Sequence, residues 1–90
     1  MSIDREELVN LDATIAAFII PRLEAFKDAT QSYPADLDSL ADWHAELDVM
    51  IDSFRLVAAV SRGEYTAHWP MQDSRPGLHL FADRLEHLWL

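Results

Sequence analysis

The chain has no cysteine, only two glycines and no long run of apolar residues. Without cysteine it can form neither disulfides nor thiolate metal sites, which is compatible with a reducing cytoplasm. A membrane-spanning helix needs about 18 or more consecutive apolar residues, and no segment provides them. The N-terminal residues, MSIDREEL, are acidic, whereas a signal peptide begins with basic residues. We therefore expect a soluble cytoplasmic protein without a membrane segment.

Basic residues are also scarce, since seven Lys and Arg stand against sixteen Asp and Glu, for a formal net charge of −9. Charge of this sign repels the backbones of nucleic acids and the surfaces of anionic membranes. We expect no direct binding of DNA or RNA. A protein with a basic surface is the partner that this charge favours.

Half of the 90 residues are hydrophobic, which predicts one ordered domain spanning residues 1–90. A chain of this length forms only a small core. Seven large aromatic residues could contribute to it: Phe18, Phe26, Phe54, Phe81, Trp43, Trp69 and Trp89. Two alternatives remain open, a small closed bundle or a bundle whose remaining apolar surface pairs with a second copy in a homo-oligomer.

Apolar residues recur at steps of three and four in three segments, which is the spacing of amphipathic helices. The first run comprises Leu8, Leu11, Ile15, Phe18, Ile19, Leu23 and Phe26. Asp4 and Glu7 are spaced to form a capping box at an early helix start. A later start, capped by Asn10 or Asp12, would leave the first nine residues as a separate arm. Because Leu8 is already in phase, we favour the early start.

The second run comprises Leu40, Trp43, Leu47, Met50, Phe54 and Val57, and the third comprises Leu78, Phe81, Leu85 and Leu88. Asp36 and Asp38 are candidate caps for the second helix. Asp73 or Ser74 could cap the third, with Pro76 in its first turn. Residues 61–75 lack any period. The fold class is therefore all-α, a small three-helix bundle with a kinked first helix and a long loop before the last helix.

The kink is expected at Pro21, which interrupts the first run. Proline cannot donate to the carbonyl of Ala17, so the helix either ends near Ile19 or continues with a kink. The apolar run keeps its phase across Pro21, which favours the kink. Arg22 then falls within the apolar arc. Either the kink rotates it to the edge, where its charged end reaches solvent or pairs with a carboxylate, or it forms, with the freed carbonyl, a polar notch facing a ligand or partner.

Helix-spaced carboxylates give the second helix an acidic face, formed by Asp38, Asp42, Glu46, Asp48 and Asp52. The first three recur every four residues, and like charges at this spacing destabilise a helix slightly. One interpretation is a solvated face that maintains solubility. The other is a surface that binds a basic partner, for example one that normally binds nucleic acid.

The 61–75 loop contains residue types that dominate binding hot spots, namely Arg62, Tyr65 and Trp69. They form either a binding element or, through Trp69 and Met71, a plug for the end of the bundle.

His79 and His87 are about 12 Å apart along a helix, too far to share one metal ion. The sequence has no catalytic motif. We expect no enzyme activity, no metal site and no cofactor.

A set of short motifs resembles a known group of proteins. The motifs are Leu11-Asp12, Pro21-Arg22-Leu23, Phe26, Tyr33-Pro34, Trp43, Leu47-Asp48, Met50-Ile51, Phe54, Gly77-Leu78, Leu80-Phe81-Ala82 and His87-Leu88-Trp89. In these the chain resembles small uncharacterised helical proteins of bacteriophages and prophages, from about residue 11 to the end but without the 61–75 loop. It departs at Val49, where those proteins usually carry lysine.

The resemblance implies a helical accessory protein of phage origin in the host cytoplasm. Small phage proteins of this kind often bind host proteins, including defence factors. The expected function is therefore non-catalytic binding and blocking of a host protein, through the acidic face, the loop or both. The alternative is an oligomeric protein that sequesters an anionic metabolite or nucleotide, with Arg22 as its charge anchor.

Overall fold

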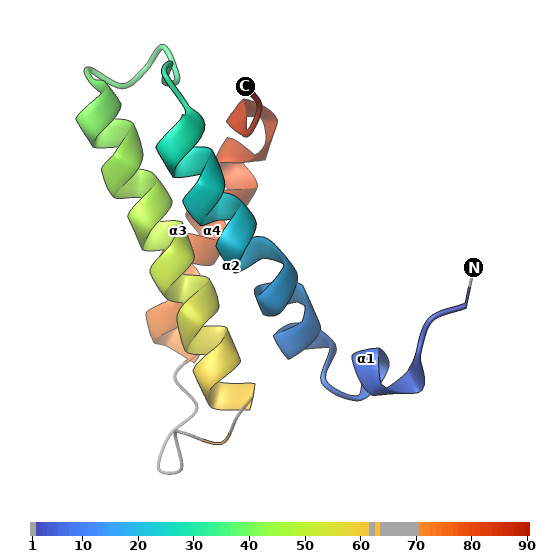
Figure 1. Ribbon diagram of the computed structural model, residues 1–90. Helices are drawn as coiled ribbons and strands as arrows, with labels where there is room; N and C mark the ends of the chain where they lie inside the picture. The colour runs from blue at the N-terminus through green and yellow to red at the C-terminus, as the bar shows by residue number, and fades with distance from the viewer. Residues whose placement is uncertain (1, 62, 64–70) are drawn as a thin grey trace.

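The computed structural model describes residues 2–61, 63 and 71–90, with the backbone alone at residues 71–73. These residues form α1 (Arg5–Val9), α2 (Leu11–Ala29), α3 (Leu40–Ser61), α4 (Met71–Arg84) and a 3-10 turn, η1 (Leu85–His87) (Figure 1). The described ranges contain no strand. The prediction of an all-α protein is confirmed.

A helix begins at each of the two predicted starts at the N-terminus, but the side chain of Asn10 makes no capping hydrogen bond at the second. The Asp4 backbone N–H donates to Oε2 of Glu7 (3.3 Å) in the expected capping box, but the helix that it starts ends at Val9. Asn10 has φ −125° and ψ 60°, outside the helical region, and α2 begins after it. The preferred single long helix is therefore wrong, because Asn10 separates a short arm helix from α2.

Pro21 lies inside α2, which continues to Ala29. The alternative in which the helix ends near Ile19 is wrong. Ala16 and Leu23, on either side of Pro21, are both fully buried, so packing holds the two halves of the helix in phase.

α3 is the central helix of the fold. Its N-terminus is capped by Ser39, whose Oγ accepts the backbone N–H of Asp42 (3.1 Å). Asp36 and Asp38 were predicted as caps and do not fill this role. The buried core comes mainly from α3: Trp43, Leu47, Met50, Ile51 and Phe54. The Trp43 ring meets Phe26 of α2 edge to face, and the Phe54 ring meets Phe81 of α4 in the same way.

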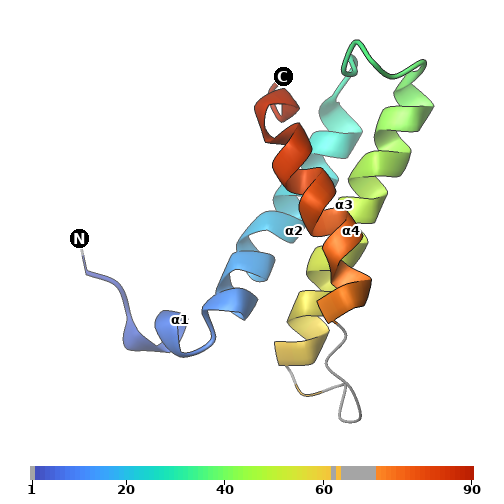
Figure 2. The same ribbon diagram turned by 180° about the vertical axis from the view of Figure 1, so that it is seen from behind.

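α2 and α4 both run alongside α3, in the opposite direction to it (Figures 1 and 2). Ion pairs fix the α2–α3 register, with Lys27 Nζ 2.8 Å from Asp48 and Arg55 Nη2 2.8 Å from Glu24. On the other side of α3, Gly77 allows close approach of α4. A Cβ at this position would collide with Oγ of Ser53 and the backbone oxygen of Val49.

α4 begins earlier than predicted. Residues 71–75 were assigned to the long loop but form the start of the helix, and Pro76 lies inside it rather than in its first turn. Among the side chains described at the start of α4, the buried residues are Ser74 and Gly77, which have no apolar side chain to produce a periodic signal. At the other end the regular helix stops at Arg84, and Trp89, which was considered for the core, is 71% exposed.

The N-terminal part of the chain projects away from the α3–α4 pair (Figures 1 and 2). The Cα radius of gyration is 14.5 Å, compared with about 12 Å for a compact domain of this length. The molecule measures 40 × 38 × 19 Å. The projecting part is α1 and the first half of α2.

Candidate functional site

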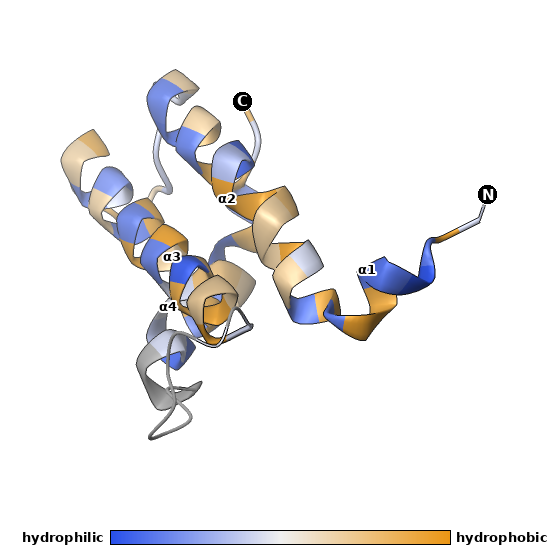
Figure 3. Cartoon of the chain, turned by 60° about the horizontal axis from the view of Figure 1, so that its bottom comes forward, coloured by the Kyte–Doolittle hydropathy of each residue, from blue (hydrophilic) through white to orange (hydrophobic). Residues whose placement is uncertain are grey.

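An apolar stripe on α1 and α2 faces solvent. Leu8, Leu11, Ile15 and Phe18 are between 48% and 58% exposed, and we call these four residues the α2 stripe. The first half of α2 shows mostly apolar colouring (Figure 3). Sequence periodicity correctly grouped these residues on one face. Phe18 was expected to contribute to the core, but it is exposed. The core face of α2 is an adjacent one, which contains Ala16 and Leu23.

A groove runs beside the stripe. Its first section has a volume of about 300 Å³ and is lined by Thr14, Ile15, Phe18, Ile19, Phe54 and Phe81. α2 supplies one wall, Phe54 of α3 and Phe81 of α4 supply the other, and Thr14 is the only polar lining residue. The groove is therefore an apolar surface shared by three helices.

A second hollow continues the first along α2. It has a volume of about 230 Å³ and is lined by Ile19, Arg22, Leu23, Phe26 and Leu88. Because Ile19 lines both hollows, they form one surface from the middle of α2 to the C-terminal segment. We call this surface the α2 groove.

Arg22 stands at the edge of the α2 groove. Its guanidinium carbon lies 3.8 Å from the centre of the Phe18 ring, and its Nη1 donates to the Phe18 carbonyl (2.8 Å). The notch predicted at the Ala17 carbonyl is instead a contact with the next carbonyl. Within the described ranges no carboxylate pairs with Arg22. The predicted structural ion pair is therefore not what holds this side chain.

The predicted acidic face of α3 is divided between two neighbours. Glu46 pairs with Arg84 of α4, and Asp48 pairs with Lys27 of α2. Asp52 lies 3.6 Å from Arg55, one turn further along α3. Asp38 and Asp42 are exposed and make no ion pair with any described residue. Of the five carboxylates, only these two are left to act as an unpaired acidic surface.

Arg84 links three parts of the chain. Its Nε donates to Glu46 (2.8 Å), and its Nη1 and Nη2 donate to the two oxygens of Asp36 (2.8 and 2.9 Å). The side chain of Arg84 is 13% exposed and that of Glu46 is 22% exposed. The hydrogen bonds from Arg84 lower the pKa of Asp36 from its ordinary value. The hydrogen bonds to Asp36 and then Glu46 raise the pKa of Arg84. The contacts of this cluster are all made within the fold, so we assign it a structural role.

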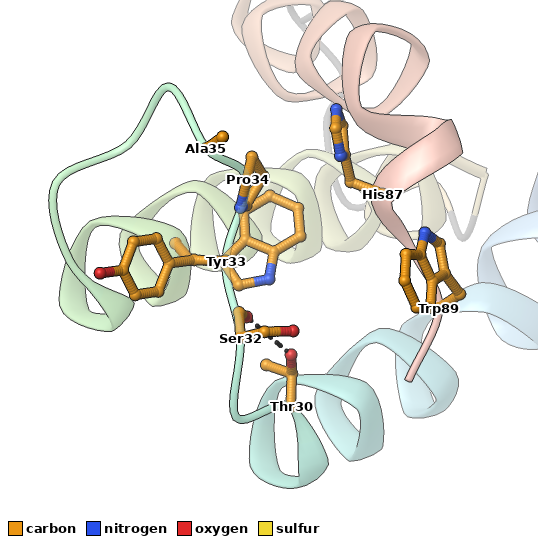
Figure 4. Close-up of a pocket in the computed structure, with 8 residues that line it drawn as sticks. Thr30, Ser32, Tyr33, Pro34, Ala35, His87 and Trp89 are labelled. Carbon is orange, nitrogen blue, oxygen red and sulfur yellow. Dashed lines mark hydrogen bonds between the residues drawn. The ribbon is translucent and has the colours of Figure 1, made fainter.

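A separate, smaller pocket lies where the α2–α3 loop meets the C-terminal segment. It has a volume of about 140 Å³ and is lined by Thr30, Ser32, Tyr33, Pro34, Ala35, Trp43, His87 and Trp89. His87 and Trp89 project from the C-terminal segment on one side, and the loop residues lie on the other (Figure 4). The Thr30 hydroxyl donates to the Ser32 carbonyl (3.0 Å). Two of its lining groups are thus already paired with each other.

The remaining candidate residues from the sequence do not form a site in the described part of the chain. Arg62, Tyr65 and Trp69 lie outside the described residues. The described residues contain no group of three or more His, Asp or Glu side chains that could hold a metal ion. The buried Nε2 of His44 has no hydrogen-bond partner among the described residues, and Asp48, four residues later, binds Lys27.

None of the described helices has the length and apolar character to span a membrane. Comparison of the chain with models of protein families, with curated proteins and with solved structures found no match.

Proposed function

We propose that this chain is a non-catalytic protein–protein interaction module whose α2 groove receives an amphipathic helix of a protein partner. The observation that carries the proposal is the exposed apolar surface formed by the α2 stripe and the α2 groove. A helix that lies in a groove typically contacts it through apolar residues at i, i+3, i+4 and i+7, and the elongated, apolar lining fits such a ligand. Half-exposed apolar side chains in a continuous surface of this kind mark interaction sites.

The charges around the groove define the partner further. Arg22 offers its guanidinium at the edge, where an acidic residue of the bound helix would form a charge-assisted hydrogen bond. The unpaired Asp38 and Asp42 favour basic residues elsewhere on the partner, as the net charge of −9 does. The partner is therefore a protein with an amphipathic, partly acidic helix on an otherwise basic surface.

We also propose that α2, α3 and α4 act as a small three-helix bundle in which α2 bends at Pro21. Proline removes one backbone hydrogen bond and its ring crowds the preceding turn, so a bend is expected at this point of a continuous helix. A bend would turn the first half of α2 away from α3. This would leave the groove open on the side of the stripe.

The target in this proposal is a host protein, such as a defence factor, blocked in the host cytoplasm by a phage-type protein. That part is supported by the sequence resemblance. The alternative, sequestration of an anionic metabolite or nucleotide, is favoured by one observation: no carboxylate of a described residue pairs with Arg22.

The experiment is a comparative capture from host lysate with three baits, namely the wild-type chain, Phe18→Asp and Val49→Asp. Val49 is 42% exposed on α3, outside the stripe, so its variant controls for an added surface charge. We expect Phe18→Asp to lose a protein that the other two baits retain. Equal capture by all three baits would contradict the proposal, and thermal stabilisation by a nucleotide that is lost in Arg22→Ala would support the alternative.

A further inference from the structure

We propose that the pocket between the α2–α3 loop and the C-terminal segment, which we call the loop pocket, binds one proline of a proline-rich peptide segment in the polyproline II conformation. The α2–α3 loop and the C-terminus lie at the same end of the molecule (Figures 1 and 2). The loop pocket and the α2 groove share no lining residue. The inference therefore does not depend on what the α2 groove receives.

Trp43 contributes an unpaired hydrogen-bond donor to the loop pocket. The residue lines the pocket although it is only 1% exposed. Its indole N–H donates to no described residue, and a buried indole N–H normally finds an acceptor. Among the buried and half-buried described residues, the only fully enclosed side-chain nitrogen or oxygen without a partner is Nε2 of His44. The Trp43 N–H is therefore not sealed in the core, and an acceptor that enters the pocket can reach it.

Pro34 and Trp89 offer apolar ring surfaces on opposite sides of the loop pocket. Pro34 is buried on the loop side, whereas Trp89 projects from the C-terminal segment and is 71% exposed (Figure 4). The ring of Tyr33 points away from Trp89 in the same view, so it does not form one of these walls. The lining contains no Asp, Glu, Lys or Arg. This lining favours an uncharged ring with an acceptor beside it.

A proline in an extended segment matches these groups. Its ring is apolar and fits between Pro34 and Trp89, and it has no N–H that would need an acceptor in the pocket. The polyproline II helix has no internal hydrogen bonds, so its carbonyls are free to accept the N–H of Trp43. Aromatic-lined sites bind such segments well because the segments are already extended and lose little entropy on binding.

The size of the loop pocket favours a single residue of a peptide over a whole small molecule. Its volume is about 140 Å³, whereas sites that enclose a small-molecule ligand have roughly 300–1000 Å³. The two hollows of the α2 groove, of about 300 and 230 Å³, suit the several side chains of a helix. One ring fills the loop pocket, and a nucleotide would extend beyond it.

Unpaired carboxylates that follow the lining residues in the chain indicate basic residues beside the proline. Asp38 lies in the α2–α3 loop and Asp42 in the first turn of α3, and both are exposed without an ion pair to a described residue. Asp36 of the same loop already pairs with Arg84. A Lys or Arg next to the proline-rich segment would be attracted by the two free carboxylates, most strongly at low salt.

The test is a titration of the isotope-labelled full chain, followed by nuclear magnetic resonance, with a synthetic oligoproline peptide that ends in two lysines. The control peptide has alanine and serine in place of the prolines. We expect saturable binding of the oligoproline peptide and a downfield shift of the Trp43 indole N–H signal as it gains an acceptor. The chain has three tryptophans, so Trp69→Phe and Trp89→Ala identify the Trp43 signal by elimination.

Variants of the C-terminal segment test the wall of the pocket. Trp89→Ala should weaken binding of the oligoproline peptide by about tenfold or more, because it removes an aromatic contact. Leu90→Ala is the matched control, since Leu90 is 74% exposed in the same segment and does not line the pocket. Its affinity should be unchanged. Both side chains are exposed, and circular dichroism checks that both variants keep the fold.

An oligoproline peptide that leaves the Trp43 signal in place up to millimolar concentration would overturn the inference, as would equal binding by Trp89→Ala and Leu90→Ala. An equal response to the alanine–serine peptide would show that charge alone causes binding, and would also overturn it. A nucleotide that moved the Trp43 signal in place of the peptide would do so in favour of a small-molecule site. Each of these outcomes leaves the proposed function of the α2 groove untouched, because that capture depends on Phe18.

Discussion

Arg84 shows how one residue can join segments that are distant in the sequence. Its guanidinium bonds to Asp36 in the α2–α3 loop and to Glu46 in α3, 48 and 38 residues away. Planar, two-pronged contacts of this kind suit arginine and would not form in the same way with lysine. The residue thereby holds the end of α4 against both neighbours.

We expect Arg84→Ala to lower the free energy of unfolding by about 1–3 kcal/mol, because it leaves Glu46 largely buried without its partner. Arg75→Ala is the matched control, since Arg75 is an exposed arginine of the same helix with no ion pair to a described residue. Chemical denaturation of the two variants measures the difference. A similar loss in both would show that the Arg84 contacts do not hold the fold together.

Acid should weaken the contact between Asp36 and Arg84. The folded state lowers the pKa of Asp36 from 3.8, chiefly through the hydrogen bonds from Arg84. The resulting stabilisation is complete above this ordinary value and is lost as the pH falls from about 4 through the folded-state pKa. Asp36→Asn should therefore flatten the fall in stability below about pH 4. The measurement is the unfolding free energy against pH, with Asp38→Asn as the unpaired control, and an unchanged slope would contradict the assignment.

Carboxylate spacing along α3 was visible in the sequence, but the partners of these carboxylates were not. The helix contains no Lys or Arg between Ala41 and Phe54, which suggested an unpaired acidic face. Two neutralising groups come from other helices, namely Lys27 of α2 and Arg84 of α4, and Arg55 of α3 itself pairs with Asp52. Spacing within one helix carries no information about which charges a neighbouring helix contributes.

At the scale of the elements, the close approach of α3 and α4 depends on Gly77. A methyl group there would meet Ser53 Oγ and a backbone oxygen of α3, and a backbone atom cannot turn aside as a flexible side chain can. Alanine is the better helix former by about 1 kcal/mol. The collision outweighs this gain because it forces the two helices apart.

We therefore expect Gly77→Ala to reduce the free energy of unfolding by about 1–3 kcal/mol. Ala82→Gly, at an exposed site in the same helix, should cost about 1 kcal/mol through helix propensity alone. Thermal and chemical denaturation would compare the two variants. A more stable Gly77→Ala protein would mean that α4 does not approach α3 as closely as described.

The predicted elements were most accurate where apolar residues repeat regularly, as from Leu40 to Val57 in α3. The start of α4 was missed because Ser74 and Gly77 pack by being small rather than apolar. The α2 stripe was recognised as one face of a helix, but periodicity cannot say whether such a face is covered. The residue that was overlooked is Ala16, which is fully buried and marks the core face of α2. Its small side chain allows this face to pack closely, but it adds little to the apolar period.

At the scale of the whole molecule, net charge and exposed apolar surface have opposite effects on association. The net charge of −9 disfavours association of like chains. The exposed apolar α2 stripe favours association, and it lies on the part of the chain that projects away from α3 (Figure 1). The net charge alone predicts a basic partner, whereas the arrangement of the helices adds an apolar surface that a partner can cover.

The central position of α3 also bears on how quickly the chain folds. α3 contacts α2, which precedes it, and α4, which follows it, whereas α2 and α4 meet only through side chains in the described ranges. Most contacts therefore form between helices that are consecutive in the sequence. Helical proteins with such local connectivity fold in microseconds to milliseconds. The link from Arg84 to Asp36 spans more of the chain than the helix pairs do, and we expect it to form last.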